Sequence, residues 1–190
     1  LFFSQSDWDY RLDTAKNGSG GYLIADSVRI NGQTFDSVGV KYKGNSSYDE
    51  TYVKNPLHIE LNTILDQSYN GYTDVKLSNG YGDPSLVREV LAYKILENYA
   101  DAPQSNFAQV YINQSYVGLY SNTESINKTF CATHFYSSGN TFVKCNPTVI
   151  PGPTTKSNLR YISADSANYS TYYEMKSDAG WSDLLDVCNA

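Results

Sequence analysis

Lys41-Tyr42-Lys43-Gly44-Asn45-Ser46-Ser47 is the stretch around which the rest of the chain is organised, and Lys54 follows a few residues later. It predicts a strand that runs into a short loop rich in hydrogen-bond donors, with cationic side chains at both ends. Glycine permits close approach of the backbone, and Asn and Ser bond to their own turn. Such a loop can hold an anion through its backbone N–H groups. The alternative is an ordinary polar hairpin loop.

The composition indicates an acidic globular protein. The 190 residues suffice for one domain with a core, or for one lobe and part of another. Hydrophobic residues make up 41% and charged residues 18%, which excludes a disordered chain. The net charge of −6 argues against a general nucleic-acid binder, and no apolar run approaches the roughly 20 residues of a membrane span. Because 18 residues are Tyr, we expect a secreted or cell-surface protein.

The first part of the chain predicts four antiparallel strands joined by tight turns. Before them, Trp8, Tyr10 and Leu12 alternate with charged residues, so residues 1–21 are expected to form an N-terminal extension, either an edge strand or a docking segment. Asn31-Gly32 is a strong hairpin signal, and Asn70-Gly71 marks a second turn. The expected strands span 22–30, 35–43, 56–62 and 72–78.

A helix follows from Pro84 to about Ala100, with Asp83 as the N-cap. Its apolar residues spread over more than half of the circumference, so the helix is expected to be covered on two sides. Glu89 projects into this apolar arc, where a carboxylate is costly unless it is paired. The alternatives are that Glu89 reaches solvent at the rim, or that it pairs locally with Arg88 or Tyr93.

The chain then predicts a third hairpin and a second region. Two strands are expected at 107–112 and 116–121, a short helix at 126–135, a strand at 140–145 and a last helix from Ser182. The prolines and glycine of Pro147–Pro153 indicate a loop or a lobe boundary. The expected organisation is an extension (1–21), a first lobe (22–125), and a linker with part of a second lobe (126–190).

This order of elements resembles the N-lobe of protein-kinase-like folds, an α+β arrangement with an antiparallel sheet packed on one long helix. In that plan a loop covers the nucleotide phosphates, and a strand lysine that contacts phosphate is held by a glutamate of the helix. Here the loop is Gly44–Ser47 and the glutamate is Glu89, while the segment Asn122–Ile126 would line the adenine pocket. The sequence contains neither GxGxxG nor Val-Ala-Ile-Lys, which excludes an ordinary eukaryotic-type kinase. The candidate lysines are Lys43, Lys54 and Lys76.

Several motifs in order resemble the CotH (spore-coat protein H) kinase family over residues 35–145. They are Tyr42-Lys-Gly-Asn-Ser-Ser47, Lys54-Asn-Pro-Leu57, Asp83-Pro-Ser-Leu-Val-Arg-Glu-Val-Leu-Ala-Tyr93, and Val110-Tyr-Ile-Asn113 followed by Gly118-Leu-Tyr120 and Glu124. The resemblance implies an atypical, secreted or surface-directed kinase. Such an enzyme transfers phosphate from ATP to Ser or Thr of a protein substrate with a divalent metal such as Mg²⁺.

The resemblance also implies roles for single residues. The loop would cover the phosphates, Lys54 or Lys43 would contact the transferred phosphate, Glu89 would orient that lysine, and Glu124 would lie beside adenine. By strand order Lys76 fits the lysine role as well, since it lies just before the helix. The nucleotide-binding positions expected from the family are Lys43, Gly44, Asn45, Ser46, Ser47, Lys54, Glu89 and Glu124.

One departure from the family concerns the metal-binding and catalytic aspartates. The family carries them in a later segment with a Trp-Asp-x-Asp-like motif, and Trp181-Ser-Asp183 does not match it. We therefore expect no catalytic or metal-binding residue within these 190 residues. Full binding of ATP and Mg²⁺ would then need a further lobe. The alternative function is a non-catalytic, Tyr-rich surface or adhesive module on a kinase-like scaffold.

The other chemical candidates are weak. His58 alternates with Leu57 and Ile59, so we expect it on the solvent side of its strand. The three cysteines form no CxxC motif and have no His at ligand spacing, which argues against a zinc site.

Overall fold

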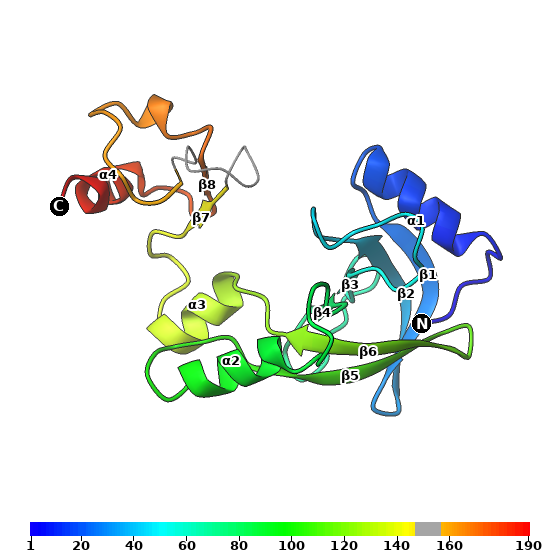
Figure 1. The fold of residues 1–190 in the computed structure, drawn as a ribbon. Helices are drawn as coiled ribbons and strands as arrows, with labels where there is room; N and C mark the ends of the chain where they lie inside the picture. The colour runs from blue at the N-terminus through cyan, green and yellow to red at the C-terminus, as the bar shows by residue number, and fades with distance from the viewer. Residues whose placement is uncertain (147–156) are drawn as a thin grey trace. The chain divides into compact units, whose positions relative to one another are not determined.

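The computed structural model describes residues 1–146 and 157–190 (Figure 1). These residues form two compact units, 1–126 and 127–190. The loop or lobe boundary predicted at Pro147–Pro153 lies outside the described residues. In the described part of the chain, no helix combines the length and the apolar character that a membrane crossing requires.

The first unit is built on a six-stranded antiparallel sheet with the order β1-β2-β3-β4-β6-β5. This confirms the predicted α+β class with an antiparallel sheet. The strands are β1 (Leu23–Ile30), β2 (Gln33–Tyr42), β3 (Leu57–Glu60), β4 (Asp74–Ser78), β5 (Ser105–Ile112) and β6 (Ser115–Thr123).

The predicted Asn-Gly turns are present. Asn31 and Gly32 have φ of 48° and 92° and join β1 to β2, while Asn70 and Gly71 have φ of 52° and 87°. Two successive positive φ values match the right-handed twist of the flanking strands, and Asn-Gly adopts them at low cost. These turns fix the register in which Val28 lies opposite Phe35.

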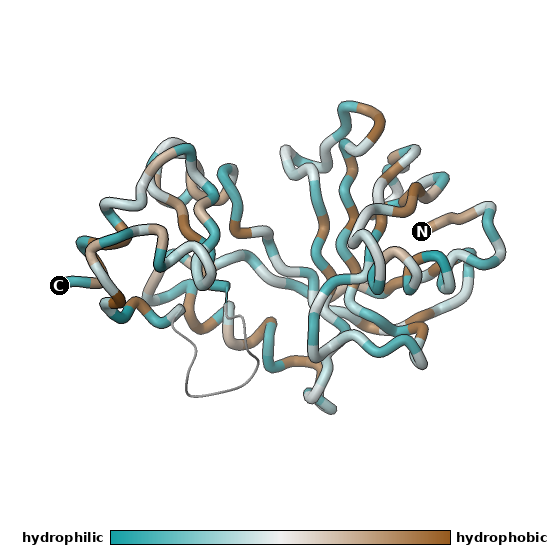
Figure 2. Tube along the Cα trace, turned by 90° about the horizontal axis from the view of Figure 1, so that it is seen from above, coloured by the Kyte–Doolittle hydropathy of each residue, from teal (hydrophilic) through white to brown (hydrophobic). Residues whose placement is uncertain are grey.

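Alternation along β2, β3 and β4 separates an apolar face from a polar face. The apolar face carries buried side chains such as Val40, Ile59 and Leu77, which belong to the core of this unit. In Figure 2 the strands accordingly carry hydrophobic and hydrophilic residues in turn. The polar face, as we call the opposite side, carries Lys41 and Lys43 of the β2 segment, His58 and Glu60 of β3, and Asp74, Lys76 and Ser78 of β4.

The first residues connect the two edges of this sheet. Phe2 forms a bridge with Ser27 of β1. The Phe3 amide donates to Asn113 Oδ1 (2.8 Å), and the Leu1 nitrogen donates to the Tyr111 carbonyl (2.9 Å) at the other edge. The sheet therefore curls around its core.

The prediction of an edge strand at residues 8–12 is wrong, because α1 (Trp8–Asn17) is a helix. Trp8 and Leu12 are four residues apart and so share one helical face. Leu12 is fully buried in the core, and Trp8 stacks on Phe3 with ring centroids 5.6 Å apart. The other alternative, a docking segment, describes residues 1–21 better.

The central helix is shorter than the predicted Pro84–Ala100. Helix α2 spans Arg88–Leu96 and packs against β5 and β6. Asp83 accepts from the Ser85 amide (3.0 Å) and the Arg88 amide (2.9 Å), which closes a turn ahead of the helix. Leu86 in that turn has φ of 60°, a left-handed conformation that a helix cannot include.

The expectation that α2 is covered on two sides is not met by the described residues. Leu91, Ile95 and Leu96 are each 47–55% exposed. The helix buries Val90, which is 7% exposed.

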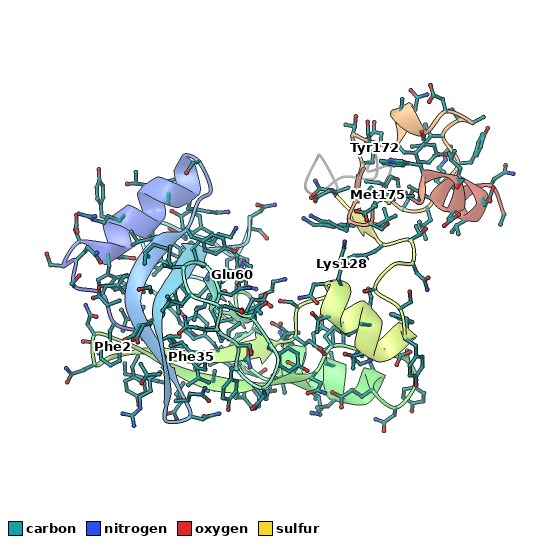
Figure 3. All side chains as sticks on the ribbon, turned by 180° about the vertical axis from the view of Figure 1, so that it is seen from behind. Phe2, Phe35, Glu60, Lys128, Tyr172 and Met175 are labelled. Atoms are coloured by element: carbon teal, nitrogen blue, oxygen red, sulfur yellow. The ribbon has the colours of Figure 1, made fainter. Side chains whose placement is uncertain are left out.

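The second unit contains α3 (Lys128–Phe135), β7 (Val143–Cys145), a 3₁₀ turn at Ser166–Asn168, β8 (Tyr173–Met175) and α4 (Trp181–Asn189). Its small core consists of Tyr169, Tyr173, Leu184 and Cys188. The side chains of both units are drawn in Figure 3, where Phe35 marks the first unit and Met175 the second. The three cysteines are free thiols.

Candidate functional site

A chain of hydrogen bonds joins Lys43 to Glu89 on the polar face. Lys43 Nζ donates to Ser78 Oγ (3.1 Å), and Ser78 Oγ donates to Glu89 Oε1 (3.2 Å). Thr123 Oγ1 donates to the same carboxylate oxygen (2.8 Å). The end of β2, the end of β4, the first turn of α2 and the end of β6 therefore meet at one point.

Strand pairing explains this convergence. The Lys43 amide donates to the Pro56 carbonyl (2.9 Å), which extends the pairing of β2 and β3 by one residue. Ser78, the last residue of β4, lies opposite Ser121 of β6. Since α2 packs against β5 and β6, its first turn brings Glu89 to these strand ends.

A cavity of about 420 Å³ opens at this point. Its walls combine the strand ends, the start of α2 and the glycine-containing segment 79–83. The lining residues are Lys43, Ser47, Pro56, Ser78, Arg88, Glu89, Ser121 and residues 79–83.

The ammonium of Lys43 is only partly compensated. Burial lowers its pKa; Glu89 opposes this effect, and the positive charge of Lys76 adds to it. Among the described residues its hydrogen bond goes to one hydroxyl, although an ammonium has three donors. An anion in the cavity would supply the missing acceptors and negative charge.

The loop after β2 is held in a defined shape. Gly44 has φ of 83°, and a Cβ there would lie 2.3 Å from Ser47 Oγ, so the position requires glycine. Asn79 Nδ2 donates to the carbonyls of Ser47 (2.9 Å) and Lys54 (3.1 Å), which ties both arms of the loop to the cavity wall. The Asn55 side chain, 1% exposed, bonds to the backbone of residue 49. Asn45 and Ser46 are exposed at the tip.

Lys54 lies apart from Lys43. Its Nζ is 5.5 Å from the centre of the Tyr120 ring, and its stem lies across Gly118, where a Cβ would come within 2.8 Å of Lys54 Cε. It borders a neighbouring hollow of about 380 Å³ with Asp83 and Leu86. The two family-matched lysines therefore border neighbouring hollows, which share Asn79, Gly80, Gly82 and Asp83 as lining residues.

Lys76 and Glu124 also lie outside the hydrogen-bond chain. Lys76 is on the polar face opposite His58, close enough for its charge to influence Lys43. Glu124 accepts from the Gln104 amide (3.1 Å), and its charge contributes to raising the pKa of Tyr72, after burial. Glu124 is not among the residues that line the 420 Å³ cavity.

The family model described as CotH kinase protein matches residues 40–190, which include the loop, α2 and the β5–β6 hairpin. The chain belongs to the CotH kinase protein family. This confirms the resemblance found in the motifs. The curated proteins contain no match to this CotH chain.

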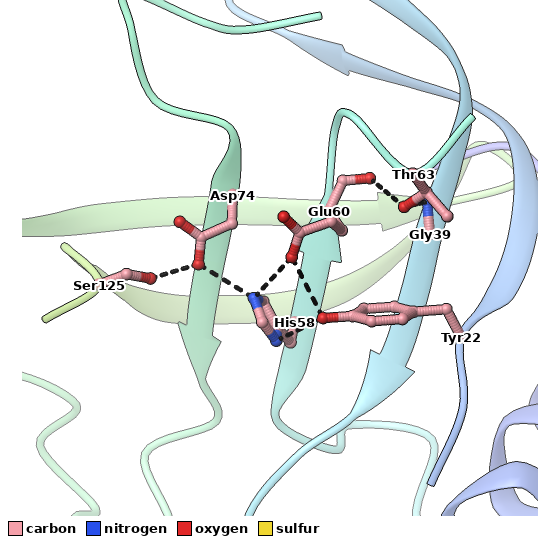
Figure 4. Close-up of polar contacts among 7 residues, drawn as sticks. All are labelled: Tyr22, Gly39, His58, Glu60, Thr63, Asp74 and Ser125. Atoms are coloured by element: carbon pink, nitrogen blue, oxygen red, sulfur yellow. Dashed lines mark hydrogen bonds and ion pairs between the residues drawn. The ribbon is translucent and has the colours of Figure 1, made fainter. Parts of the chain in front are cut away.

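The polar face of this CotH chain holds a second cluster, which corrects the expectation for His58. The histidine faces away from the core as predicted, but its side chain is only 16% exposed. Its Nε2 lies 3.0 Å from Asp74 Oδ2 and its Nδ1 lies 3.1 Å from the Tyr22 hydroxyl. Glu60 also accepts from Tyr22 (3.2 Å), and Ser125 donates to Asp74 (Figure 4).

Two contributors to the CotH site were missed from sequence. Ser78 and Thr123 give Glu89 its hydroxyl partners, whereas the expected positions include neither residue. Alternation from Lys76 places Ser78 on the same face, which is the signal that could have found it. For Thr123 we see no comparable sequence signal.

No three His, Cys, Asp or Glu side chains among residues 1–146 and 157–190 are grouped so as to hold a metal ion. Within the CotH cavity, Asp83 is engaged by Ser85 and by the Arg88 amide, and Glu89 by two hydroxyls. The two carboxylates among the described lining residues of the cavity therefore already have hydrogen-bond partners.

Proposed function

We propose that the first unit is the nucleotide-binding lobe of a CotH-type protein kinase that transfers the γ-phosphoryl group of ATP to Ser or Thr of a protein. The observation that carries this proposal is the half-buried Lys43 linked through Ser78 to Glu89 beside the family loop. A lysine held by a helix glutamate next to a phosphate-covering loop is the arrangement that kinases use.

In this proposal Lys43, rather than Lys54 or Lys76, contacts a phosphate. Its ammonium is desolvated and short of acceptors, so binding of an anion there is favourable. The link to Glu89 through Ser78 keeps the amine near the strand ends and fixes the direction of one N–H. The remaining donors can then point into the cavity.

The loop at 44–47 supplies the second set of contacts. Its glycine turn and polar residues can offer backbone N–H groups to phosphate oxygens, as anion-binding nests do. Such contacts position the phosphate chain and offset negative charge, which is most of what a protein contributes to phosphoryl transfer. The segment after β6, including Glu124, is our proposed neighbour of the adenine ring.

Stabilisation of the chain by ATP tests the proposal. At ATP concentrations about 100-fold above the dissociation constant, the free energy of unfolding should rise by about 2.7 kcal/mol. Urea unfolding with and without ATP measures this, and a Lys43→Met variant should show a smaller rise at the same ATP concentration. If ATP left the wild-type curve unchanged, the chain would act as a scaffold and the non-catalytic alternative would be favoured.

A further inference from the structure

Helix α1 lies before the family-matched residues 40–190 and contacts the loop that follows β2. Four pairs of side-chain or backbone groups make the connection, all within the first unit. They are Lys16 Nζ to the Gly44 carbonyl (2.6 Å), the Tyr48 hydroxyl to Asp13 Oδ1 (2.8 Å), Asn17 Nδ2 to Glu50 Oε2 (3.1 Å), and the Tyr42 hydroxyl to Asp9.

The contacts begin on the core side of the sheet. Tyr42 belongs to the buried core, and its hydroxyl reaches Asp9 on α1. Lys43 is the next residue along the strand, so its side chain points to the opposite side, into the phosphate cavity. Helix α1 and the cavity therefore lie on opposite sides of this strand end.

The bond from Lys16 sets the orientation of one peptide group. A trans peptide is planar, with its C=O and N–H pointing in opposite directions. Because the Gly44 carbonyl is turned toward Lys16 on α1, the Asn45 N–H is turned away from α1. Lys43 lines the cavity on this same side, away from α1.

The backbone N–H groups of the loop can donate hydrogen bonds to a ligand. In the described structure, the backbone N–H groups of residues 45–47 donate to no other group. Asn79 already fixes the carbonyls of Ser47 and Lys54 from the cavity side. Helix α1 therefore holds the outer side of a loop whose inner side is held by Asn79.

We propose that α1 sets the loop for phosphate, with Lys16 as a positioning residue that aims the Asn45 N–H at the phosphate chain of a nucleoside diphosphate or triphosphate. This inference rests on the proposed function of the cavity. Lys16 itself does not contact the ligand; it acts through the Gly44 peptide. The contacts of Tyr48 and Glu50 keep the loop against the helix, and that of Tyr42 holds the end of β2 there.

The test compares Lys16→Met with wild type in two measurements on the full chain. Methionine keeps much of the stem and removes the ammonium. Hydrogen exchange of the amides at 44–50 is measured without nucleotide, and ADP binding is measured by calorimetry. Lys16→Arg retains the cation, and Lys176→Met, which removes a lysine paired with Glu174 in the second unit, is the matched control.

Lys16→Met should speed exchange at 44–50 and lower ADP affinity about tenfold, the size expected when the Asn45 N–H no longer donates to a charged phosphate oxygen. The midpoint of urea unfolding should not change, Lys16→Arg should restore most of the affinity, and Lys176→Met should behave as wild type. Equal loop exchange and equal ADP affinity in Lys16→Met and wild type would overturn the inference alone. Absence of ADP binding to the wild type would overturn the proposed function, and the inference with it.

Discussion

Two clusters of polar side chains lie on the same face of one sheet, and they differ in how completely their groups are paired. In the His58 cluster each ring nitrogen has a partner, Tyr22 on one side and Asp74 on the other. In the Lys43 chain the ammonium has one hydroxyl partner and opens on a cavity. The first cluster is therefore complete by itself, whereas the second still has capacity for an anion.

The completeness of pairing distinguishes a structural network from a binding site. Both clusters contain half-buried charges, so burial alone does not separate them. A closed network stabilises the fold because every polar group is satisfied. An open one carries a cation that is only partly compensated, which costs stability until a ligand supplies the missing partner. We therefore expect substitutions in the first cluster to change stability and substitutions in the second to change binding.

The largest effect on stability should come from Asp74→Ala. The Asp74 carboxylate accepts from His58 and from Ser125, so its removal should lower the free energy of unfolding by about 2–3 kcal/mol. Urea unfolding measures this loss, with Asp178→Ala at an exposed position as the control. ADP affinity should stay at the wild-type value. A large loss of ADP affinity with unchanged stability would reverse the roles given to the two clusters.

The same carboxylate gives a smaller, pH-dependent effect. Burial opposes ionisation of Asp74, but hydrogen bonds from His58 and Ser125 and the nearby charges outweigh it and lower its pKa below the ordinary 3.8. A lowered folded-state pKa stabilises the fold above the unfolded-state pKa, and this stabilisation is lost as the pH falls through the folded-state value. The stability difference between wild type and Asp74→Asn should therefore be full near pH 6 and shrink below about pH 4. A difference that grew as the pH fell would contradict this assignment.

Ser78→Ala should weaken binding moderately. The variant removes the hydroxyl that joins Lys43 to Glu89 and leaves Glu89 with Thr123. Loss of one such bond should lower ADP affinity about fivefold. Calorimetry measures the change, and Ser78→Thr, which keeps a hydroxyl, should retain most of the affinity. Identical ADP affinity in Ser78→Ala and wild type would remove Ser78 from the site.

The smallest effect on binding is expected from Lys54→Met. Lys54 borders the neighbouring hollow and lies over the Tyr120 ring, so its charge is outside the proposed phosphate contacts. ADP affinity should change by no more than about twofold, because a charge that does not contact the phosphates is screened and contributes little. If Lys54→Met lost more affinity than Lys43→Met, the phosphate contact would belong to Lys54.

Structural features that depend on residues close together in the sequence were the ones that could be predicted from it. The Asn31-Gly32 turn and the antiparallel strands followed from turn chemistry and alternation. The motifs gave Glu89 on the central helix and left the lysine open between Lys43, Lys54 and Lys76. Helix α1 was missed because Trp8 and Leu12 fit both an alternating and a helical pattern over so short a stretch. The late start of α2 depends on the left-handed Leu86, which a propensity argument does not foresee.

The partners within the site could not be predicted for a different reason. Ser78 meets Lys43 only because β2, β3 and β4 pair in a particular register. His58 was expected on the solvent side because it alternates with Leu57 and Ile59, and its contact with Asp74 forms only between neighbouring strands. Long-range pairing of this kind is set by the whole sheet and leaves no short motif in the chain.

Titration of ADP into wild type and Lys43→Met tests the central claim most directly. Lys43 is the desolvated cation of the cavity, and hydrogen bonds to charged groups are strong, so the variant should bind ADP about 10- to 100-fold more weakly. Its urea-unfolding midpoint should be no lower than that of the wild type, since a half-buried charge is removed. Equal ADP affinity in the two proteins would contradict the assignment of this cavity as the phosphate site.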